Sequence, residues 1–149
     1  MKKILFAASE AVPFMKTGGL ADVTGSLPKY FDKKNYDVRV ILPKYVCMEE
    51  RWKGQLHFLC HFYVNLSWRK QYVGIFETTY DGITYYLVDN EFYFAGNAPY
   101  NNIYEDVEKF AFFSKAVLEA LPYLDFCPDI IHCHDWQTGL LPVFLRTLY

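Results

Sequence analysis

The chain has 149 residues, with 15 Lys or Arg against 17 Asp or Glu, so its formal net charge is −2. A hydrophobic fraction of 52% and an aromatic fraction of 19% fit one globular domain with a sizeable core, and exclude a disordered, collagen-like or coiled-coil chain. Near-neutral charge without a basic stripe argues against nucleic-acid binding, because nothing would attract a phosphate backbone.

The chain begins with a short apolar run between charged residues. The run Ile4–Ala8 follows Lys2 and Lys3 and is soon followed by the acidic Glu10. Because charged residues limit it on both sides, it is too short for the core of a signal peptide. Every apolar stretch ends well before the ~20 residues that a membrane span requires. We therefore expect a cytoplasmic protein without a membrane segment. Its four cysteines form no CxxC pair, and we expect reduced thiols.

The first forty residues predict a strand, a helix and a second strand. Ile4–Ala8 is continuously apolar, as in a strand buried on both faces of a parallel sheet. Apolar residues at helical spacing from Leu20 predict a helix to about Asn35, kinked but not divided at Pro28. Val38–Leu42 is the second strand and completes a βαβ unit.

The middle of the chain has the partly alternating Tyr, Phe, Val and Thr residues of antiparallel strands. We predict these strands over 56–66, 72–80 and 83–88, with Asp81-Gly82 as a two-residue hairpin turn. A loop rich in Gly, Pro and Asn follows over 89–102.

The last third predicts a helix over 105–121, a strand over 130–133 and a helix over 138–148. The order is then βαβ, a β-rich insertion and αβα. This order indicates an α/β fold, with an open, mostly parallel, Rossmann-like sheet and a β-hairpin-rich insertion.

Two loops fall at the carboxyl ends of the parallel strands, where such sheets bind ligands. The first ends in Lys16-Thr17-Gly18-Gly19 and leads straight into a helix. Adjacent glycines let a ligand approach the backbone amides, and the helix N-terminus and Lys16 add positive charge, which favours a phosphate. The pattern is neither a Walker loop nor GxGxxG, so a plain strand-to-helix turn stays equally open.

Two carboxylates flank this first loop. Asp22 lies on the first helical turn, where it either complements the helix dipole or faces a sugar or acceptor hydroxyl. Glu10 directly follows the buried strand, so we expect it at the edge of the crevice in a functional role.

The second loop follows the strand 130–133 and reads HCHDWQ over 132–137. We expect His132 to pack in the core and His134 to face the crevice. Asp135 would cap the last helix or orient a histidine. A zinc site is not favoured, because Cys133 could join the two histidines only if the strand broke.

A second set of candidate metal ligands, His57, Cys60 and His61, lies in a predicted strand. That placement does not favour zinc either, and we expect no metal in the protein.

These motifs closely resemble the starch and glycogen synthase family of retaining glucosyltransferases, in particular its bacterial glycogen synthases. The matching stretches are KTGGLADV over 16–23 with Ser9-Glu10 before it, EKFAFFSKAVLE over 108–119, and PDIIHCHDWQTGL over 128–140. The resemblance runs in order along the whole chain. Gln137 departs from it, since many relatives carry His there.

The resemblance implies a GT-B fold, with the active site between two Rossmann-like domains. It implies transfer of glucose from ADP-glucose to the non-reducing end of an α-1,4-glucan such as glycogen, without metal or other cofactor. Residues 1–149 would be an incomplete N-terminal, acceptor-side domain, and the C-terminal nucleotide-binding domain would be absent. We expect such a piece to be inactive alone, to bind ADP-glucose weakly, and to self-associate through apolar surface that the missing part covers.

The resemblance also assigns the donor contacts by position. Lys16, Gly18 and Gly19 would contact the diphosphate of ADP-glucose. Lys16 would stabilise negative charge on the departing ADP, which makes it an expected catalytic residue.

The remaining site residues would face the sugar. Asp22 and Tyr100 would lie near the transferred glucose and the acceptor, and His134 would support the sugar through its 6-hydroxyl and backbone. Asp22 and His134 are expected catalytic residues. We add Glu10, from its place after the first strand, and Asp106, from the resemblance, to the substrate-binding set.

Two other classes of function stay open: another GT-B glycosyltransferase, and a non-catalytic glucan-binding domain suggested by the many aromatic residues. Most of those aromatics are expected in the core and the strands. Tyr100 and Trp136 are the ones that we assign to a sugar site.

Overall fold

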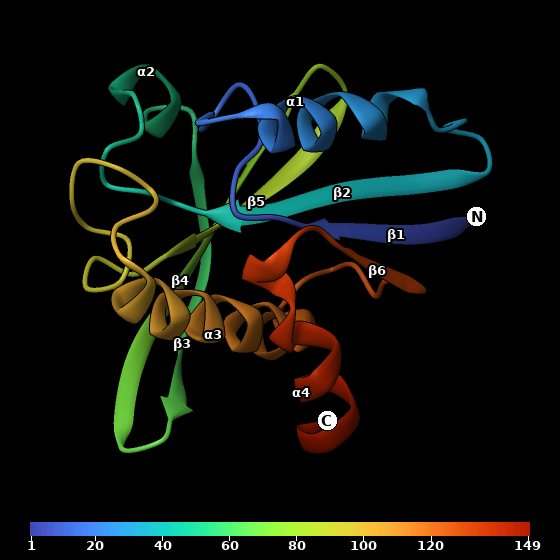
Figure 1. The fold of residues 1–149 in the computed structure, drawn as a ribbon. Helices are drawn as coiled ribbons and strands as arrows, with labels where there is room; N and C mark the ends of the chain where they lie inside the picture. Colours follow the sequence, from blue (N-terminus) through green and yellow to red (C-terminus); the bar gives the residue numbers. More distant parts are fainter.

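A six-stranded sheet with the order β3-β4-β5-β2-β1-β6 forms the centre of the computed structural model, which describes residues 1–149 (Figure 1). The strands are β1 (Lys2–Ala7), β2 (Tyr36–Pro43), β3 (His57–Leu66), β4 (Arg69–Tyr80), β5 (Ile83–Asp89) and β6 (Ile130–Cys133). Strands β5, β2, β1 and β6 are parallel, and β3 and β4 extend the sheet as an antiparallel hairpin next to β5. The predicted fold class is confirmed.

Helices cover both faces of the sheet (Figure 1). Helix α1 (Gly19–Ser26), the 3₁₀ turn η1 (Leu27–Tyr30) and the short helix α2 (Glu50–Lys53) lie on one face. The other face carries α3 (Ile103–Ala120), followed by η2 (Leu121–Tyr123), and then η3 (Trp136–Thr138) and α4 (Leu140–Leu148) after β6. No helix combines the length and the apolar character needed to cross a lipid bilayer.

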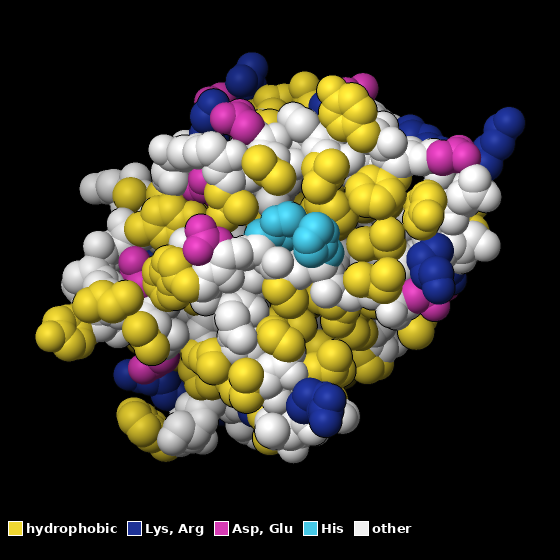
Figure 2. All heavy atoms as spheres, turned by 45° about the vertical axis from the view of Figure 1, so that its right-hand side comes forward, with side chains coloured by type: hydrophobic (Ala, Val, Ile, Leu, Met, Phe, Trp, Pro, Cys, Tyr) yellow, Lys and Arg dark blue, Asp and Glu magenta, His cyan; other side chains and the backbone are white.

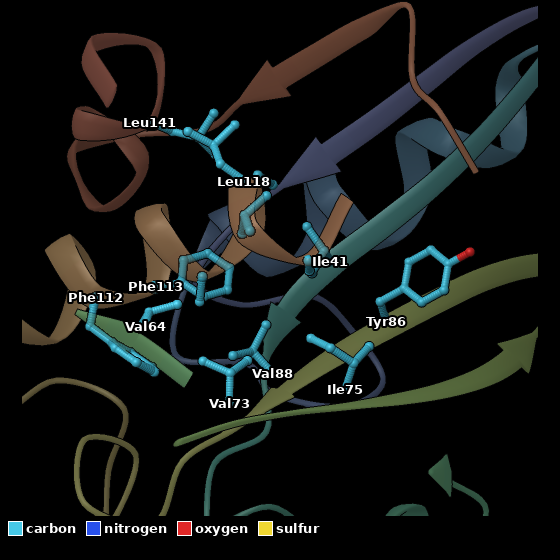
Figure 3. Close-up of a cluster of buried hydrophobic side chains, with 14 of the residues drawn as sticks. Ile41, Val64, Val73, Ile75, Tyr86, Val88, Phe112, Phe113, Leu118 and Leu141 are labelled. Carbon is cyan, nitrogen blue, oxygen red and sulfur yellow. The ribbon is translucent and has the colours of Figure 1, made fainter. Parts of the chain in front are cut away.

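The core has two parts, one on each face of the sheet. The larger contains 22 buried residues between α3 and the sheet, where Phe113 and Leu118 lie close to Ile41 (Figure 3). The smaller contains 11 buried residues on the α1 face, among them Phe6 and Val40. Successive residues of a strand point to opposite faces, so a strand covered from both sides must be apolar at every position, as β1 and β2 are over their buried stretches.

The first helix ends earlier than predicted. Helix α1 stops at Ser26 and continues as the 3₁₀ turn η1, which ends at Tyr30, so the prediction of a helix to about Asn35 is wrong. Pro28 explains the change, because it has no N–H to bond the carbonyl of Thr24 and its ring crowds that carbonyl. The short helix α2 was not predicted.

The prediction of a two-residue hairpin turn at Asp81-Gly82 is confirmed. Asp81 and Gly82 have φ of 50° and 79° between β4 and β5, as a two-residue hairpin turn requires.

Helix α3 begins two residues earlier than predicted, because the side chain of Asn102 caps it by accepting from the Glu105 amide at 3.0 Å. Pro142 lies in the first turn of α4, where a missing N–H costs little.

Candidate functional site

Three loops meet at the carboxyl ends of the parallel strands. Ala7 of β1 pairs with Cys133 of β6, and the amide of His134 donates to the carbonyl of Ala7 at 3.1 Å. The loop after β5 returns to the same edge, since the hydroxyl oxygens of Tyr100 and Ser9 are 2.6 Å apart. The structure therefore brings the predicted residues of both loops, and Tyr100, to one edge of the sheet.

The carboxylate of Glu10 lies at the N-terminus of α1, and Glu10 is only 2% exposed. It accepts hydrogen bonds from the Thr17 hydroxyl (2.5 Å), the Thr17 amide (3.2 Å) and the amides of Gly18 and Ala21 (3.3 Å each). The first amides of a helix have no partner within the helix and carry partial positive charge. The protein's own carboxylate therefore satisfies part of the anion site that the sequence predicts.

The hydrogen bonds of Glu10 leave fewer amide groups of the glycine loop available to a ligand. The Gly18 amide is taken by Glu10, whereas no side chain accepts from the Gly19 amide. A Cβ at Gly18 or Gly19 would meet nothing within 4 Å, so contacts within the chain do not require either glycine. Direct contact of Glu10 with a substrate stays a prediction, and in this structure its carboxylate orders the loop.

Lys16 and Asp22 form an ion pair at the mouth of this loop. The Lys16 ammonium is 2.9 Å from a carboxylate oxygen of Asp22, and both side chains are 54% exposed. Exposed pairs of this kind contribute about 0.2–1 kcal/mol. An anionic ligand can therefore take Asp22's place at Lys16 at little cost, and Asp22 then has free oxygens for hydroxyl groups.

Tyr100 lies against the first loop through its hydroxyl. This group bonds Ser9 and donates to Glu10 at 3.1 Å, and its ring packs 5.9 Å from that of Phe110. Burial raises the pKa of Tyr100 to about 12, with the carboxylate of Glu10 acting in the same direction. The hydroxyl is thus neutral near pH 7.

A buried ion pair holds the loop that carries Tyr100. Lys109 and Asp106 of α3 are 3.3 Å apart and are buried. Lys109 donates to the carbonyl of Pro99 (2.8 Å) and to the side chain of Asn101 (3.1 Å), and Asp106 accepts from the Asn101 amide. These bonds hold the residues directly before and after Tyr100, which are Pro99 and Asn101. Asp106 remains a predicted substrate contact, while its observed partners make it a residue that positions Tyr100.

His134 directly follows β6 and is half-buried. Burial lowers its pKa to about 4, and the neighbouring His132 contributes in the same direction, so the imidazole is neutral at pH 7. Its Nε2 atom is buried without a hydrogen-bond partner. The His134 amide bonds Ala7 and its carbonyl accepts from Thr138 at 2.9 Å, so the backbone is partly engaged within the chain.

The expectation that His132 packs in the core is wrong. His132 is exposed, because β6 is an edge strand of the sheet. Its ring centroid is 4.3 Å from that of His134, and Figure 2 shows two adjacent histidine side chains within a largely hydrophobic area. No group of three or more His, Cys, Asp or Glu residues is placed to hold a metal ion.

The rest of the second loop turns sharply at Asp135. This residue has φ of 64° and caps η3 by accepting from the Trp136 amide at 2.7 Å, so it caps the 3₁₀ turn and not the last helix itself. Trp136 is 48% exposed, and its ring lies 5.7 Å from Phe110, which also contacts Tyr100. Trp136 and Tyr100 thus flank one phenylalanine beside the crevice.

Three residues of the site were missed by the sequence-based prediction. Ser9 and Thr17 stand beside predicted residues and carry hydroxyls, which was a usable signal. Lys109 gave no signal, because a lysine within an amphipathic helix normally faces solvent.

Comparison with known proteins gives one consistent result. The family model described as starch synthase catalytic domain matches residues 3–149. Glycogen synthases of Lachnoclostridium phytofermentans and Lachnospira eligens are 70% and 64% identical to the chain over 98% of its length. The catalytic domain of starch synthase IV from Arabidopsis thaliana, bound to ADP and acarbose, superposes with a TM-score of 0.86 over 99% of the chain at 30% identity. The chain spans about 30% of the length of each of these proteins.

Proposed function

Because this chain belongs to the starch synthase catalytic domain family, we propose that it forms the acceptor-side part of a glycogen synthase active site. In this proposal the whole enzyme transfers glucose from ADP-glucose to the non-reducing end of an α-1,4-glucan, with retention of configuration. The observation that carries the proposal is the meeting of Lys16, Asp22, Tyr100 and His134 at one edge of the sheet.

The first loop is suited to the departing nucleotide. When the bond between the glucose C1 and the ADP oxygen breaks, negative charge grows on the diphosphate and positive charge on the sugar. The ammonium of Lys16 and the amide of Gly19 would stabilise that diphosphate, and aimed positive charge of this kind lowers the barrier. Glu10 contributes by holding the loop in one conformation before the ligand arrives.

The sugar would meet mainly neutral groups. The imidazole of His134 and the hydroxyl of Tyr100 are both uncharged near pH 7, which suits hydrogen bonds to sugar hydroxyls better than proton transfer. The acceptor hydroxyl oxygen would bond to C1, and its proton would pass to the departing phosphate. Such a route needs no carboxylate nucleophile from the protein.

The proposal also covers what the chain does by itself. Since it spans about 30% of its relatives, the remaining donor contacts would come from other parts of the enzyme. We propose that the chain alone binds ADP-glucose weakly and transfers no glucose. The proposed setting is the cytoplasm, with ADP-glucose and glycogen as the partners.

A hybrid enzyme tests the function. In the hybrid, this chain replaces the matching 146-residue segment of the 70% identical relative. Glycogen should gain labelled glucose from ADP-glucose at a rate within about tenfold of the parent enzyme. A folded hybrid that prefers UDP- or GDP-glucose would point to another GT-B transferase. A folded hybrid that binds glycogen without transferring glucose would point to a glucan-binding domain.

We also propose that the isolated chain self-associates through apolar residues around β6 and α4. Ile130, Val143 and Leu145 are 48%, 50% and 43% exposed there. Sedimentation velocity should show a mass that rises with concentration, and the double replacement Val143→Ser and Leu145→Ser should reduce this rise. A monomer at all concentrations would contradict it.

A further inference from the structure

A third parallel strand, β2, also brings a residue to the edge of the sheet where the candidate site lies. Tyr45 stands two residues after the end of β2 and is only 1% exposed. Its hydroxyl donates to the backbone carbonyl of Ser9 at 2.6 Å. The proposed transfer reaction uses neither this hydroxyl nor the carbonyl that it bonds.

The carbonyl of Ser9 depends on this one hydrogen bond. Ser9 is fully buried, and no other group of the chain donates to its carbonyl. A buried carbonyl without a donor is unfavourable, because it has lost its hydrogen bonds to water. The Tyr45 hydroxyl therefore fixes the orientation of the peptide group that joins Ser9 to Glu10.

That peptide group lies between two contacts of the candidate site. On one side, the hydroxyl oxygen of Ser9 is 2.6 Å from the hydroxyl oxygen of Tyr100. On the other side, the carboxylate of Glu10 accepts from the Thr17 hydroxyl and the Gly18 amide. A rotation of this peptide group would move both side chains together. One hydrogen bond from Tyr45 thus constrains the glycine loop and Tyr100 at the same time.

Tyr45 is itself held firmly by its surroundings. The amides of its two neighbours, Lys44 and Val46, donate to the carbonyls of Val88 (2.7 Å) and Phe94 (3.0 Å). Its ring packs edge-on against the ring of Phe94, with 5.7 Å between the ring centroids. Burial raises the pKa of Tyr45 well above its ordinary value, so the hydroxyl keeps its proton near pH 7 and donates it to the carbonyl.

We propose that Tyr45 is a positioning residue for the transfer reaction and acts through the backbone of Ser9. The inference rests on the proposed function for the reaction itself. The Tyr45 hydroxyl keeps Glu10 at the N-terminus of α1 and Ser9 against Tyr100, and, because it is buried, it touches neither substrate. A misplacement of about 1 Å at the reacting groups lowers a rate by up to about 10²-fold, so this remote bond affects turnover.

The replacement Tyr45→Phe tests the proposal, because it removes the hydroxyl and leaves the ring in the core. In NMR spectra of the isotope-labelled chain, the amide signals of Thr17, Gly18 and Tyr100 should shift. In the hybrid enzyme, kcat should fall by about tenfold while KM for ADP-glucose stays within about twofold. This split is expected because the groups that bind the substrates remain present and only their alignment for the transfer is lost.

Tyr85→Phe is the matched control. Tyr85 is also fully buried and packs against the first loop, with its ring 4.8 Å from that of Phe14, but its hydroxyl has no hydrogen-bond partner. This replacement should leave kcat unchanged and should shift the three amide signals less. A second measurement needs no variant. In the unaltered chain, the hydroxyl proton of Tyr45 should exchange with solvent more slowly than that of Tyr30, which is 84% exposed.

A kcat of Tyr45→Phe within about twofold of the unaltered hybrid, or unshifted amide signals, would overturn the proposal while the proposed function stands. An equal fall in kcat for Tyr85→Phe would overturn it too, because the effect would then come from the core and not from the bond to Ser9. If the amide signals shift but the hybrid does not use ADP-glucose, the proposed function fails and the control of the loop by Tyr45 remains. A Tyr45 hydroxyl proton that exchanges as fast as that of Tyr30 would contradict the bond itself, whether or not the variant folds.

Discussion

The loops after β1 and β6 leave neighbouring strands and face the same crevice, yet they are built in opposite ways. In the first, Glu10 is buried and its carboxylate accepts four hydrogen bonds from the loop and the helix that follow it. In the second, Nε2 of His134 and Oε1 of Gln137 are buried without partners. The buried carboxylate of the first loop has all its partners within the chain, whereas the second loop retains buried polar atoms that a ligand or another segment must satisfy.

This difference suggests that the two loops bind different kinds of chemical group. A loop that is ordered in advance can hold Lys16 in place for a charged group, because no reorganisation is needed when charge develops. A loop with unpaired neutral groups gains most from a ligand with hydroxyls, since an unpaired buried polar atom costs about 1–3 kcal/mol.

The largest effect is expected from removing the carboxylate that orders the first loop. Glu10→Ala should lower the free energy of unfolding by about 4 kcal/mol, because it leaves several buried donors without an acceptor. Urea unfolding of the chain measures this change. Glu91→Ala, at an exposed position, should change it by less than about 0.5 kcal/mol. A loss below about 1 kcal/mol for Glu10→Ala would show that the first loop does not depend on this residue.

The buried pair behind Tyr100 should have the next largest effect. Lys109→Met should cost about 3 kcal/mol, because it leaves Asp106 buried and unpaired. It should also shift the NMR signals of Tyr100, since Lys109 holds Pro99. The double replacement Asp106→Leu with Lys109→Met should recover more than half of the stability but not the Tyr100 signals. Recovery of both would mean that the pair does not position Tyr100.

A smaller, pH-dependent effect is expected from the second loop. The pKa of His134 is about 4 in the folded chain against an ordinary histidine value of 6.5, so between these pH values the unfolded chain binds more protons. His134 therefore contributes stability that is fully present above pH 6.5 and is lost as the pH falls toward 4. The loss should be about 1–2 kcal/mol for this half-exposed ring.

Urea unfolding at about pH 7 and about pH 5 measures this effect. His134→Gln should remove most of the difference between the two pH values, and His57→Gln, on the exposed side of β3, should leave it unchanged. An equal pH difference in the His134→Gln variant would assign the effect to other groups.

The sequence predicted the sheet well, because strands buried on both faces must be apolar throughout and Asp81-Gly82 permits few turns. It could not show that β6 lies at an edge, since the residue pattern of so short a strand does not distinguish an edge strand from a central one. His132 was misplaced for that reason. It also could not show whether Glu10 points toward solvent or toward the helix. The buried state of Lys109 depends on its bond to Pro99 in the preceding loop, which no local pattern reveals.

The direct test of the central claim is the turnover of the hybrid enzyme with Lys16→Ala. If the first loop holds Lys16 for the departing diphosphate, kcat should fall by about 10²–10³-fold, while Lys29→Ala, a surface lysine paired with Asp81, should leave it unchanged. A kcat within about twofold of the unaltered hybrid would contradict the role of this loop.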